Sequence, residues 1–481
     1  MSISSTTSPS TSVIVLAAGL GKRMHSSLPK VLHEVGGEPL VVHLLKKIQK
    51  ALPASSVGVI VGHGKDLVQE RIRSCGDLES SKISLIPQAE QRGTGHAVRC
   101  AIESEWGQER LKGKGAVLVL PGDAPLVTSE LITALSAPLK GASARVLTCT
   151  LEDPTGYGRL VRKRKDGPVS RIVEERDANS QEKKIREVAV SMYLFESSFL
   201  SLTIKKLKPQ NAQGEFYLTD VIAQAVKAKK KVEALGWGQA EDARGVNDPW
   251  ELLQAREIVQ KRILMDWAKK GVLFTESFST CIDATVLFEG AATVGRGVAL
   301  KGKTQIAREV VLENDVQLTD VRVGERAHIK KGSVAENSRI GSQAKVGPYA
   351  HLRPNSDVGS GSKIGNFVEI KNANIGSDTS IAHLSYVGDA QIGNRVNIGC
   401  GFVTCNFDGR LVEGQRKHQT VIEDDVFVGS DCQAVAPVRL GRGCYVASGS
   451  TITENVEADS LAIARSRQVN KAGYAKKLRQ S

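Results

Sequence analysis

A branched apolar residue recurs at every sixth position through most of the second half of the chain. A period of six fits neither an α-helix, which repeats about every 3.6 residues, nor a single strand, whose side chains alternate between two faces. It fits short strands joined by tight turns, with three hexads forming one coil of a triangular prism. The repeat positions, which we expect to point inward, are Val294, Leu300, Ile306, Leu312 and Leu318, then Ile340, Val346, Leu352, Val358, Ile364 and Ile370, then Ile375, Ile381, Val387, Ile392 and Ile398, and finally Ile422, Val428, Ala434, Leu440, Val446 and Ile452.

The coils of such a prism bury their apolar residues only by stacking on one another, so the sequence predicts one continuous parallel β-helix. Residues 404–422 match three hexads in length but lack the repeat, which predicts an extruded loop. The period alone does not fix the handedness of the coil. Glycine follows six repeat positions and suits the predicted turns because it accepts positive φ; these glycines are Gly341, Gly347, Gly365, Gly393, Gly429 and Gly441.

At 481 residues the chain exceeds one ordinary domain core, and we expect two or three domains. The first twelve residues are rich in Ser and Thr and lack the basic start and apolar core of a secretory signal, so we expect a disordered tail. No apolar run approaches the roughly 20 residues needed to cross a bilayer, which argues against membrane insertion. The eight Cys residues show neither CxxC pairs nor zinc-ligand spacing, which favours reduced thiols and a cytoplasmic location.

The net charge of +13 is spread along the chain and is not gathered in one basic segment. We therefore expect no nucleic-acid partner. Pockets for small phosphorylated substrates explain the excess of Lys and Arg equally well.

The first half alternates strand-like and helix-like runs, which predicts a mostly parallel, Rossmann-like sheet with helices on both faces. Ligands of such sheets bind beyond the carboxyl ends of the strands. After the run from Ser12, expected strands are residues 57–61, 83–86, 116–120, 145–150 and 188–195, and expected helices are residues 40–51, 95–105 and 218–228.

Polar loops follow several of these expected strands. The first strand ends in Gly19 and leads to Arg23 and Lys30, a combination of backbone N–H groups and cations that suits phosphate. It matches neither the GxGxxG nor the GxxxxGK[ST] motif, and alone it would be an ordinary turn. Asp123 follows another apolar strand, where a carboxylate could meet a divalent ion, although Asp is equally typical of turns and helix caps.

Several motifs in order make a resemblance specific. The segments LAAGLGKRM, LPKVL, QAEQRGTGHA, GDAPL, DPTGYGR, IVEERDA, NAQGEFYLTD and GVND resemble those of sugar-1-phosphate nucleotidyltransferases. Together with the hexads, and with LRPN, NFVEIKNA, AHLSYVGDA, NIGCGFVTCNFDG, DDVFVGSD and AIAR, the chain looks like a member of a bifunctional bacterial family. That family combines N-acetylglucosamine-1-phosphate uridylyltransferase and glucosamine-1-phosphate acetyltransferase activities. The resemblance spans about Val13 to Arg467 and implies a left-handed β-helix.

For the first half the resemblance implies a uridylyl transfer site that takes UTP, a sugar phosphate and Mg²⁺. Asp123 and Asn247 would hold the metal, and Lys30 and Arg23 would meet phosphates. The residues of this implied site are Leu16, Ala17, Ala18 and Gly19 around the nucleotide, Arg23, Lys30, Gln88, Gly93 and Thr94 at the phosphates and uracil, and Gly122, Asp123, Gly158, Glu174 and Asn247 at the metal and sugar.

For the second half the resemblance implies an acetyltransferase site that takes acetyl-CoA, with His383 as the general base. An amine must lose a proton to attack a thioester, and an imidazole can take that proton at neutral pH. His383 lies off the inward repeat positions, so we expect it to project from the prism. The family assembles as homotrimers. The other implied residues are Arg353, Lys371, Tyr386 and Asn397 for the sugar phosphate, and Cys400, Asn406, Phe407, Ser430, Ser448 and Arg465 for acetyl-CoA.

The chain departs from the family at particular positions. Ala189 stands where an Asn commonly contacts the sugar, so the choice of sugar is open. Phe407 replaces a Tyr, Cys400 and Ser448 stand where Ala is common, and the loop after Gly409 is longer.

The expected segments are a tail (1–12), a nucleotidyltransferase domain (13–248), a linker helix (249–272), the β-helix (273–456) and a second tail (457–481). Asp248 followed by Pro249 predicts the start of the linker helix. The tail is expected to reach a neighbouring chain through Arg465. Two further readings stay open: a sugar nucleotidyltransferase of other specificity with a trimerising, non-catalytic β-helix, and a non-catalytic scaffold.

Overall fold

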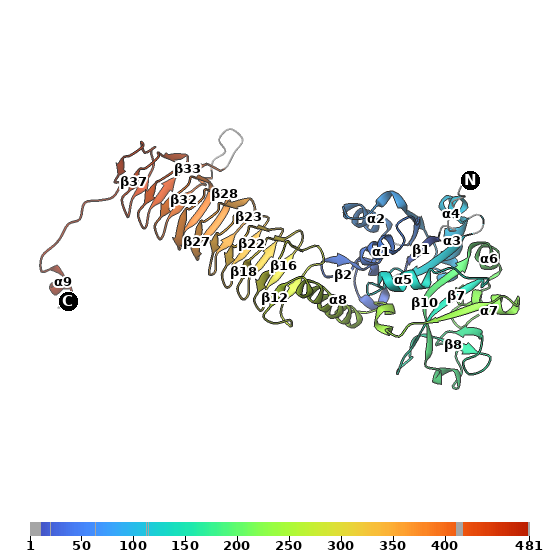
Figure 1. Ribbon diagram of the computed structural model, residues 1–481. Helices are drawn as coiled ribbons and strands as arrows, with labels where there is room; N and C mark the ends of the chain where they lie inside the picture. The colour runs from blue at the N-terminus through green and yellow to red at the C-terminus, as the bar shows by residue number, and fades with distance from the viewer. Residues whose placement is uncertain are drawn as a thin grey trace, which may run out of the picture. The chain divides into compact units, whose positions relative to one another are not determined.

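The computed structural model describes residues 11–19, 21–62, 64–111, 113, 115–409 and 417–479. The chain folds as two compact units, Met1–Val259 and Gln260–Ser481 (Figure 1). The division falls inside helix α8 (Pro249–Lys269). Thr11 and Ser12, expected in the tail, belong to the first strand, and the rest of that expected tail lies outside the described residues. Within these residues no helix is long and apolar enough to cross a membrane.

The first unit is built on a nine-stranded sheet whose central strands run in the order β11-β7-β10-β6-β1-β4-β5. Strands β6, β1, β4 and β5 pair in parallel, whereas β10 is antiparallel to both of its neighbours, β6 and β7. The mostly parallel sheet is therefore confirmed. The strands are β1 (Thr11–Ala17), β4 (Val57–Val61), β5 (Ile83–Pro87), β6 (Ala116–Pro121), β7 (Ala144–Thr150), β8 (Gly158–Arg162), β9 (Val169–Val173), β10 (Glu187–Glu196) and β11 (Val232–Gly236).

The sheet separates two apolar cores because successive side chains of a strand point to opposite faces. In β1, Val13 and Val15 belong to one buried cluster and Ile14 to the other. Helix α1 (Leu40–Ala51) packs into the first cluster and α3 (Thr94–Glu103) into the second. The remaining helices of this unit are α2 (Lys65–Ser74), α4 (Glu105–Arg110), α5 (Ser129–Leu135), α6 (Ser197–Thr203) and α7 (Asp220–Lys227).

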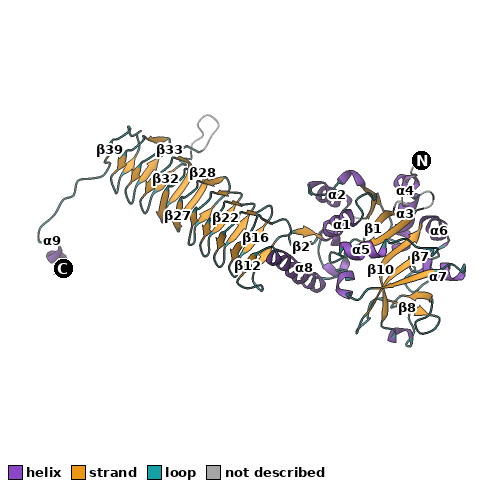
Figure 2. Cartoon of the chain, in the orientation of Figure 1, coloured by secondary structure: helices purple, strands orange, loops and turns teal. Residues whose placement is uncertain are grey.

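The second unit is a column of stacked coils whose strands pair in parallel (Figure 2). Its strands form an 11-stranded and a 17-stranded sheet, which run from β12 (Val272–Phe274) to β39 (Leu461–Ala462). Strands paired along one face lie 18 residues apart, as Cys281 and Ala299 do, or 17 apart, as Gln305 and Arg322 do. The column thus extends a few residues beyond the segment 273–456 expected from the repeat.

The interior of the column confirms the hexad pattern, because every predicted repeat position is buried and belongs to one apolar cluster. The gap in the pattern between Leu318 and Ile340 is filled by Val323, Ile329 and Ala335. A five-residue step follows Leu318 and puts these residues out of phase with the earlier hexads. Small Ala335 further masks the repeat.

The glycines of the repeat have a different role from the one expected. Of the six, Gly347 alone has a positive φ, of 98°. A side chain at the other five would strike the backbone of the next coil; a Cβ on Gly341, for example, would lie 2.6 Å from the amide nitrogen of Ser360. These glycines therefore permit close stacking of coils. Left-handed corners are held in part by Asn and Asp, such as Asn355 at φ 63° and Asp320 at φ 56°.

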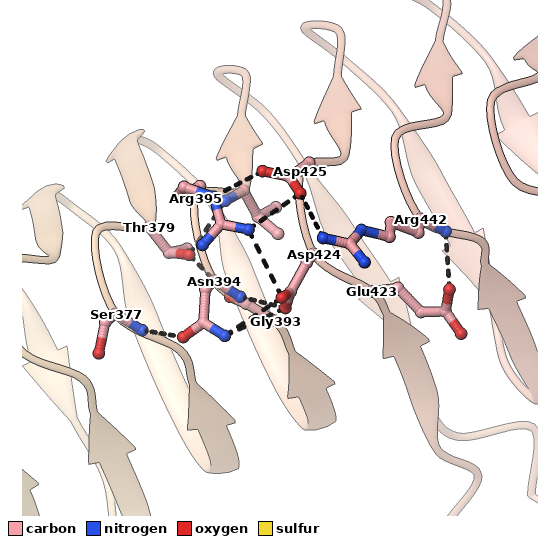
Figure 3. A network of polar contacts seen from close by, with 10 residues as sticks. Ser377, Thr379, Gly393, Asn394, Arg395, Glu423, Asp424, Asp425 and Arg442 are labelled. Carbon is pink, nitrogen blue, oxygen red and sulfur yellow. Dashed lines mark hydrogen bonds and ion pairs between the residues drawn. The ribbon is translucent and has the colours of Figure 1, made fainter.

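The extruded loop is confirmed between β32 (Val403–Cys405) and β33 (Thr420–Ile422), with residues 410–416 outside the described part. Polar contacts join the coils on either side of it (Figure 3). Asn394 donates to Asp424, 30 residues later, and Arg395 contacts Asp425 at 2.7 Å. The separation is 30 residues instead of 17 or 18 because the loop lies within that coil. Exposed ion pairs contribute about 0–1 kcal/mol each, so the buried ladder contributes more to holding the coils together.

We expect Ile364→Ala to destabilise the β-helix by about 2–5 kcal/mol, because Ile364 is fully buried and its removal leaves a cavity between coils. Lys363→Ala, in the same strand but exposed, is the matched control. Urea unfolding followed by circular dichroism measures both; equal midpoints would contradict the proposed packing.

Candidate functional site

The first cluster of expected site residues lies at the carboxyl ends of the parallel strands. Leu16 and Ala17 end β1, followed by Ala18 and Gly19, and β6 beside it leads into Gly122 and Asp123. The Gly122 amide donates to the Leu16 carbonyl at 2.8 Å, which ties the two strand ends together. The expected phosphate loop therefore sits at the edge of the sheet where ligands of this architecture bind.

A second group of expected residues gathers beyond β5. The side chain of Gln88 lies 3.0 Å from His96 and donates to the Gly93 carbonyl at 3.4 Å. Gly93 has φ 100°, and a Cβ there would lie 2.7 Å from the Phe216 carbonyl oxygen. Thr94 accepts a hydrogen bond from the Leu218 amide at 3.1 Å. The structure thus brings Gln88, Gly93 and Thr94 together.

Asp123 and Asn247, the expected metal ligands, converge on one cation of the chain itself. The Lys30 ammonium forms an ion pair with Asp123 Oδ2 and donates to Asn247 Oδ1 at 3.2 Å. A carboxylate and an amide oxygen are hard ligands that suit Mg²⁺. Among the described residues no group of three or more His, Cys, Asp or Glu side chains could hold a metal.

The start of helix α8 positions Asn247. The Asp248 side chain accepts from the Glu251 amide at 2.9 Å, which confirms Asp248 as the helix cap. The Glu251 carboxylate in turn accepts a hydrogen bond from the backbone N–H of Asn247 at 2.6 Å. The Val246 amide donates to the Asp123 carbonyl at 2.9 Å, so the two expected ligands are linked through the backbone.

The expected sugar side contains a partly buried carboxyl group. Glu174 accepts from the Thr219 hydroxyl at 3.0 Å, and burial raises its pKa above the ordinary value. A Cβ on Gly158 would lie 3.4 Å from Glu174 Oε2, so the glycine allows this approach. Ala189 pairs with Gly158 in the sheet and is buried. Arg23 lies exposed on a short 3₁₀ helix, Lys22–Met24.

The expected acetyl-CoA residues Cys400, Ser430, Ser448 and Arg465 share one corner of the column with His383. Asn406 and Phe407 follow β32 in the 17-stranded sheet and do not lie on this corner. His383 is exposed, as predicted, and Asn366 lies beside it in register one coil earlier. The Asn366 Oδ1 is 2.6 Å from His383 Nδ1. Further along this corner the backbone amide of Asp431 donates a hydrogen bond to the Cys400 carbonyl. The backbone amide of Ser430 donates to Ser448 Oγ at 3.2 Å. Arg465 donates to Ser448 of its own chain at 2.7 Å.

The expected sugar-phosphate residues divide between two faces. Arg353, Lys371 and Tyr386 lie on successive coils of one face, where Lys371 pairs with Gly388. A Cβ on Gly388 would collide with the Tyr386 hydroxyl and with the side-chain amide of Asn406, so only glycine leaves room for both groups. Asn397 is in β31 (Asn397–Ile398) of the other sheet, so it does not share a face with the other three.

Comparison with known proteins decides the family. A model of the MobA-like NTP transferase domain matches residues 13–188, and a model of six bacterial transferase hexapeptide repeats matches residues 337–372 and 419–454. The curated protein "Bifunctional protein GlmU" of Shouchella clausii is 41% identical over 96% of this chain and 98% of its own length. That of Enterococcus faecalis is 44% identical over 97% and 98%. The chain belongs to the GlmU family.

A solved structure of UDP-glucose pyrophosphorylase complexed with UDP-glucose covers 53% of this chain and 100% of its own, with a TM-score of 0.42 and 16% identity. Membership of the GlmU family agrees with the two-domain architecture: a Rossmann-like nucleotidyltransferase domain and a left-handed parallel β-helix of hexapeptide repeats.

Sequence reasoning missed partners that this GlmU-family fold supplies. Asn366 orients His383, and its position one coil of 17 residues earlier was a usable signal. Glu369 pairs with Arg353 at 2.8 Å. Lys417, at the end of the extruded loop, places its ammonium 4.9 Å from the ring centre of Phe407, a contact that no periodicity indicates.

We expect Asn366→Ala to lower the kcat of acetyl transfer about tenfold or more, because the imidazole loses the acceptor that fixes its tautomer. Asn366→Asp keeps the acceptor, and its negative charge favours imidazolium, so the acidic limb of the pH–rate profile should move to higher pH. Steady-state kinetics across pH tests both; an unchanged kcat in Asn366→Ala would refute the orienting role.

We expect Glu174→Gln to stabilise the first unit at neutral pH and to weaken binding of the sugar phosphate about tenfold. Burial raises the pKa of Glu174, so ionising this group costs stability as pH rises through the pKa of the folded state. The gain should shrink as pH falls toward about 4, where the carboxyl group is neutral. Urea unfolding at several pH values measures this; a pH-independent gain would contradict it.

Proposed function

We propose that this chain makes UDP-N-acetylglucosamine in two steps. Acetyl-CoA first acetylates glucosamine 1-phosphate, and UTP then transfers its uridylyl group to the N-acetylglucosamine 1-phosphate formed. The observation that carries the proposal is that each unit holds its own constellation: Lys30 between Asp123 and Asn247 in one, and His383 on Asn366 in the other.

In the acetyl transfer step, the amine nitrogen of the sugar attacks the thioester carbonyl carbon, and CoA leaves as the thiolate. With Asn366 bound to Nδ1, the Nε2 atom of His383 is free to take the proton of the amine and return it to the leaving sulfur. Arg353 and Lys371 supply positive charge for the sugar phosphate. The corner that carries Cys400, Ser430, Ser448 and Arg465 continues from His383 along the column.

In the uridylyl transfer step, a phosphate oxygen of the sugar attacks the α-phosphorus of UTP in line, and pyrophosphate leaves. That oxygen is already anionic, so no general base is required. Lys30 and Arg23 neutralise phosphate charge, and the backbone loop after β1 wraps the nucleotide. Mg²⁺ bound at Asp123 and Asn247 would add charge neutralisation at the phosphate oxygens.

The proposal includes a cytoplasmic homotrimer. Asn397 lies on a different face from Arg353, Lys371 and Tyr386, so a neighbouring chain would have to bring it to the sugar site. Exposed stacked rings on the column, such as Tyr349 with Phe367 at 5.8 Å between ring centres, offer apolar surface for such packing. The eight cysteines lack the CxxC spacing of metal or redox sites, which suits a reducing compartment.

A second candidate is uridylyl transfer to another sugar phosphate. Buried Ala189 favours it, because it removes the amide that commonly contacts the sugar beside Gly158. Comparing kcat/KM for N-acetylglucosamine 1-phosphate with that for glucose 1-phosphate separates the two candidates.

We expect His383→Ala to lower the rate of CoA release about a thousandfold and to leave the rate of pyrophosphate release unchanged. We expect Asp123→Ala to lower the rate of pyrophosphate release by a similar factor and to leave CoA release unchanged. The matched control is His328→Ala, which removes another histidine of the β-helix. His328 lies outside the expected site, and its Nε2 is 2.7 Å from Glu313 Oε1. Both assays are run on each purified variant. Loss of both activities in either variant would argue against two separate sites.

A further inference from the structure

The cation held by Asp123 and Asn247 in this structure is the chain's own Lys30. Its ammonium contacts the Asp123 carboxylate and lies 3.2 Å from Asn247 Oδ1. The Lys30 side chain is 13% exposed and that of Asp123 17%, so water screens the pair only partly. One ammonium thus uses the same two oxygens that a divalent ion would need.

The backbone of Lys30 is fixed, whereas its charged end can move. Gly21 has φ 58°, and a Cβ there would lie 2.7 Å from the Lys30 Cβ, so the loop packs directly on the stem. Lys30 begins a 3₁₀ turn, Lys30–Leu32, after Pro29. The methylene groups of Lys30 beyond its packed Cβ are flexible and can move the ammonium to another anion.

Two cations cannot share these oxygens, because like charges a few ångströms apart repel strongly in a partly buried site. We propose that Lys30 is a built-in competitor of the divalent cation: it keeps the metal affinity low until a triphosphate draws its ammonium away. Nucleotide and metal therefore bind with positive cooperativity, and by linkage each tightens the other. This inference rests on the proposed metal role of Asp123 and Asn247.

The test measures Mn²⁺ binding to the full-length protein by electron paramagnetic resonance, without nucleotide. We expect Lys30→Met to bind Mn²⁺ roughly tenfold tighter than the unmodified protein or more, because the competing charge is gone. Lys30→Arg keeps the charge and should stay near the unmodified protein. Adding Asp123→Asn to Lys30→Met should abolish the gain.

A second measurement follows the coupling. UTP without sugar phosphate should tighten Mn²⁺ binding by a smaller factor in Lys30→Met than in the unmodified protein, after subtraction of Mn²⁺ bound by UTP in solution. The matched control is Lys82→Met, which removes an ammonium that contacts Glu79 at 2.5 Å in the same unit. Unchanged far-UV circular dichroism and an unchanged urea unfolding profile show that the first unit of each variant is folded.

Equal or weaker Mn²⁺ binding in Lys30→Met would overturn the inference, as would Lys30→Arg binding as tightly as Lys30→Met. These outcomes are separate from a failure of the proposed function. Normal pyrophosphate release with no effect of Lys30 on Mn²⁺ affinity refutes only the competition. The expected Mn²⁺ result without uridylyl transfer refutes only the proposed reaction.

Discussion

The inward ladder of aliphatic side chains is the interaction on which the second unit depends. Each coil buries residues such as Ile364 and Ile381 only against its neighbours, so the coils form together and stack in a fixed register. That register places residues 17 or 18 positions apart directly beside one another. Asn366 and His383 meet for this reason, and the same stacking extends their corner toward Ser448 and Arg465. Glycines such as Gly341 allow the close approach of the coils.

In the first unit, the order of the strands brings the site residues together. Parallel strands β6, β1 and β4 end at one edge, so loops distant in sequence meet there. The backbone amide of Val246, the residue before Asn247, donates to the Asp123 carbonyl next to the start of α8, and Glu251 in the first turn of that helix accepts from the backbone amide of Asn247. The site therefore holds the Asp123 carboxylate and the Asn247 amide oxygen in contact with the Lys30 ammonium. Opposite charges held this close favour binding of a metal and a polyphosphate as a pair.

The carboxyl group of Glu174 in the first unit lowers the stability of the fold when it is ionised. Glu174 is partly buried, which raises its pKa and makes its ionised form costly. The Thr219 hydroxyl donates to this carboxyl group at 3.0 Å. Ala189, buried beside Gly158, removes a polar group from the same neighbourhood.

The sequence by itself determined the features that local geometry encodes. The hexad period located the buried ladder, the alternating segments of the first half indicated a mostly parallel sheet, and Asp248 before Pro249 marked the start of a helix. Tertiary structure alone decided which distant residues meet: β10 runs antiparallel, Asn397 lies on another face from Lys371, and Lys30 bridges Asp123 and Asn247. Periodicity reports which side of a strand is buried. It does not report strand direction or how one-residue shifts in coil length add up, and those set the contacts between distant side chains.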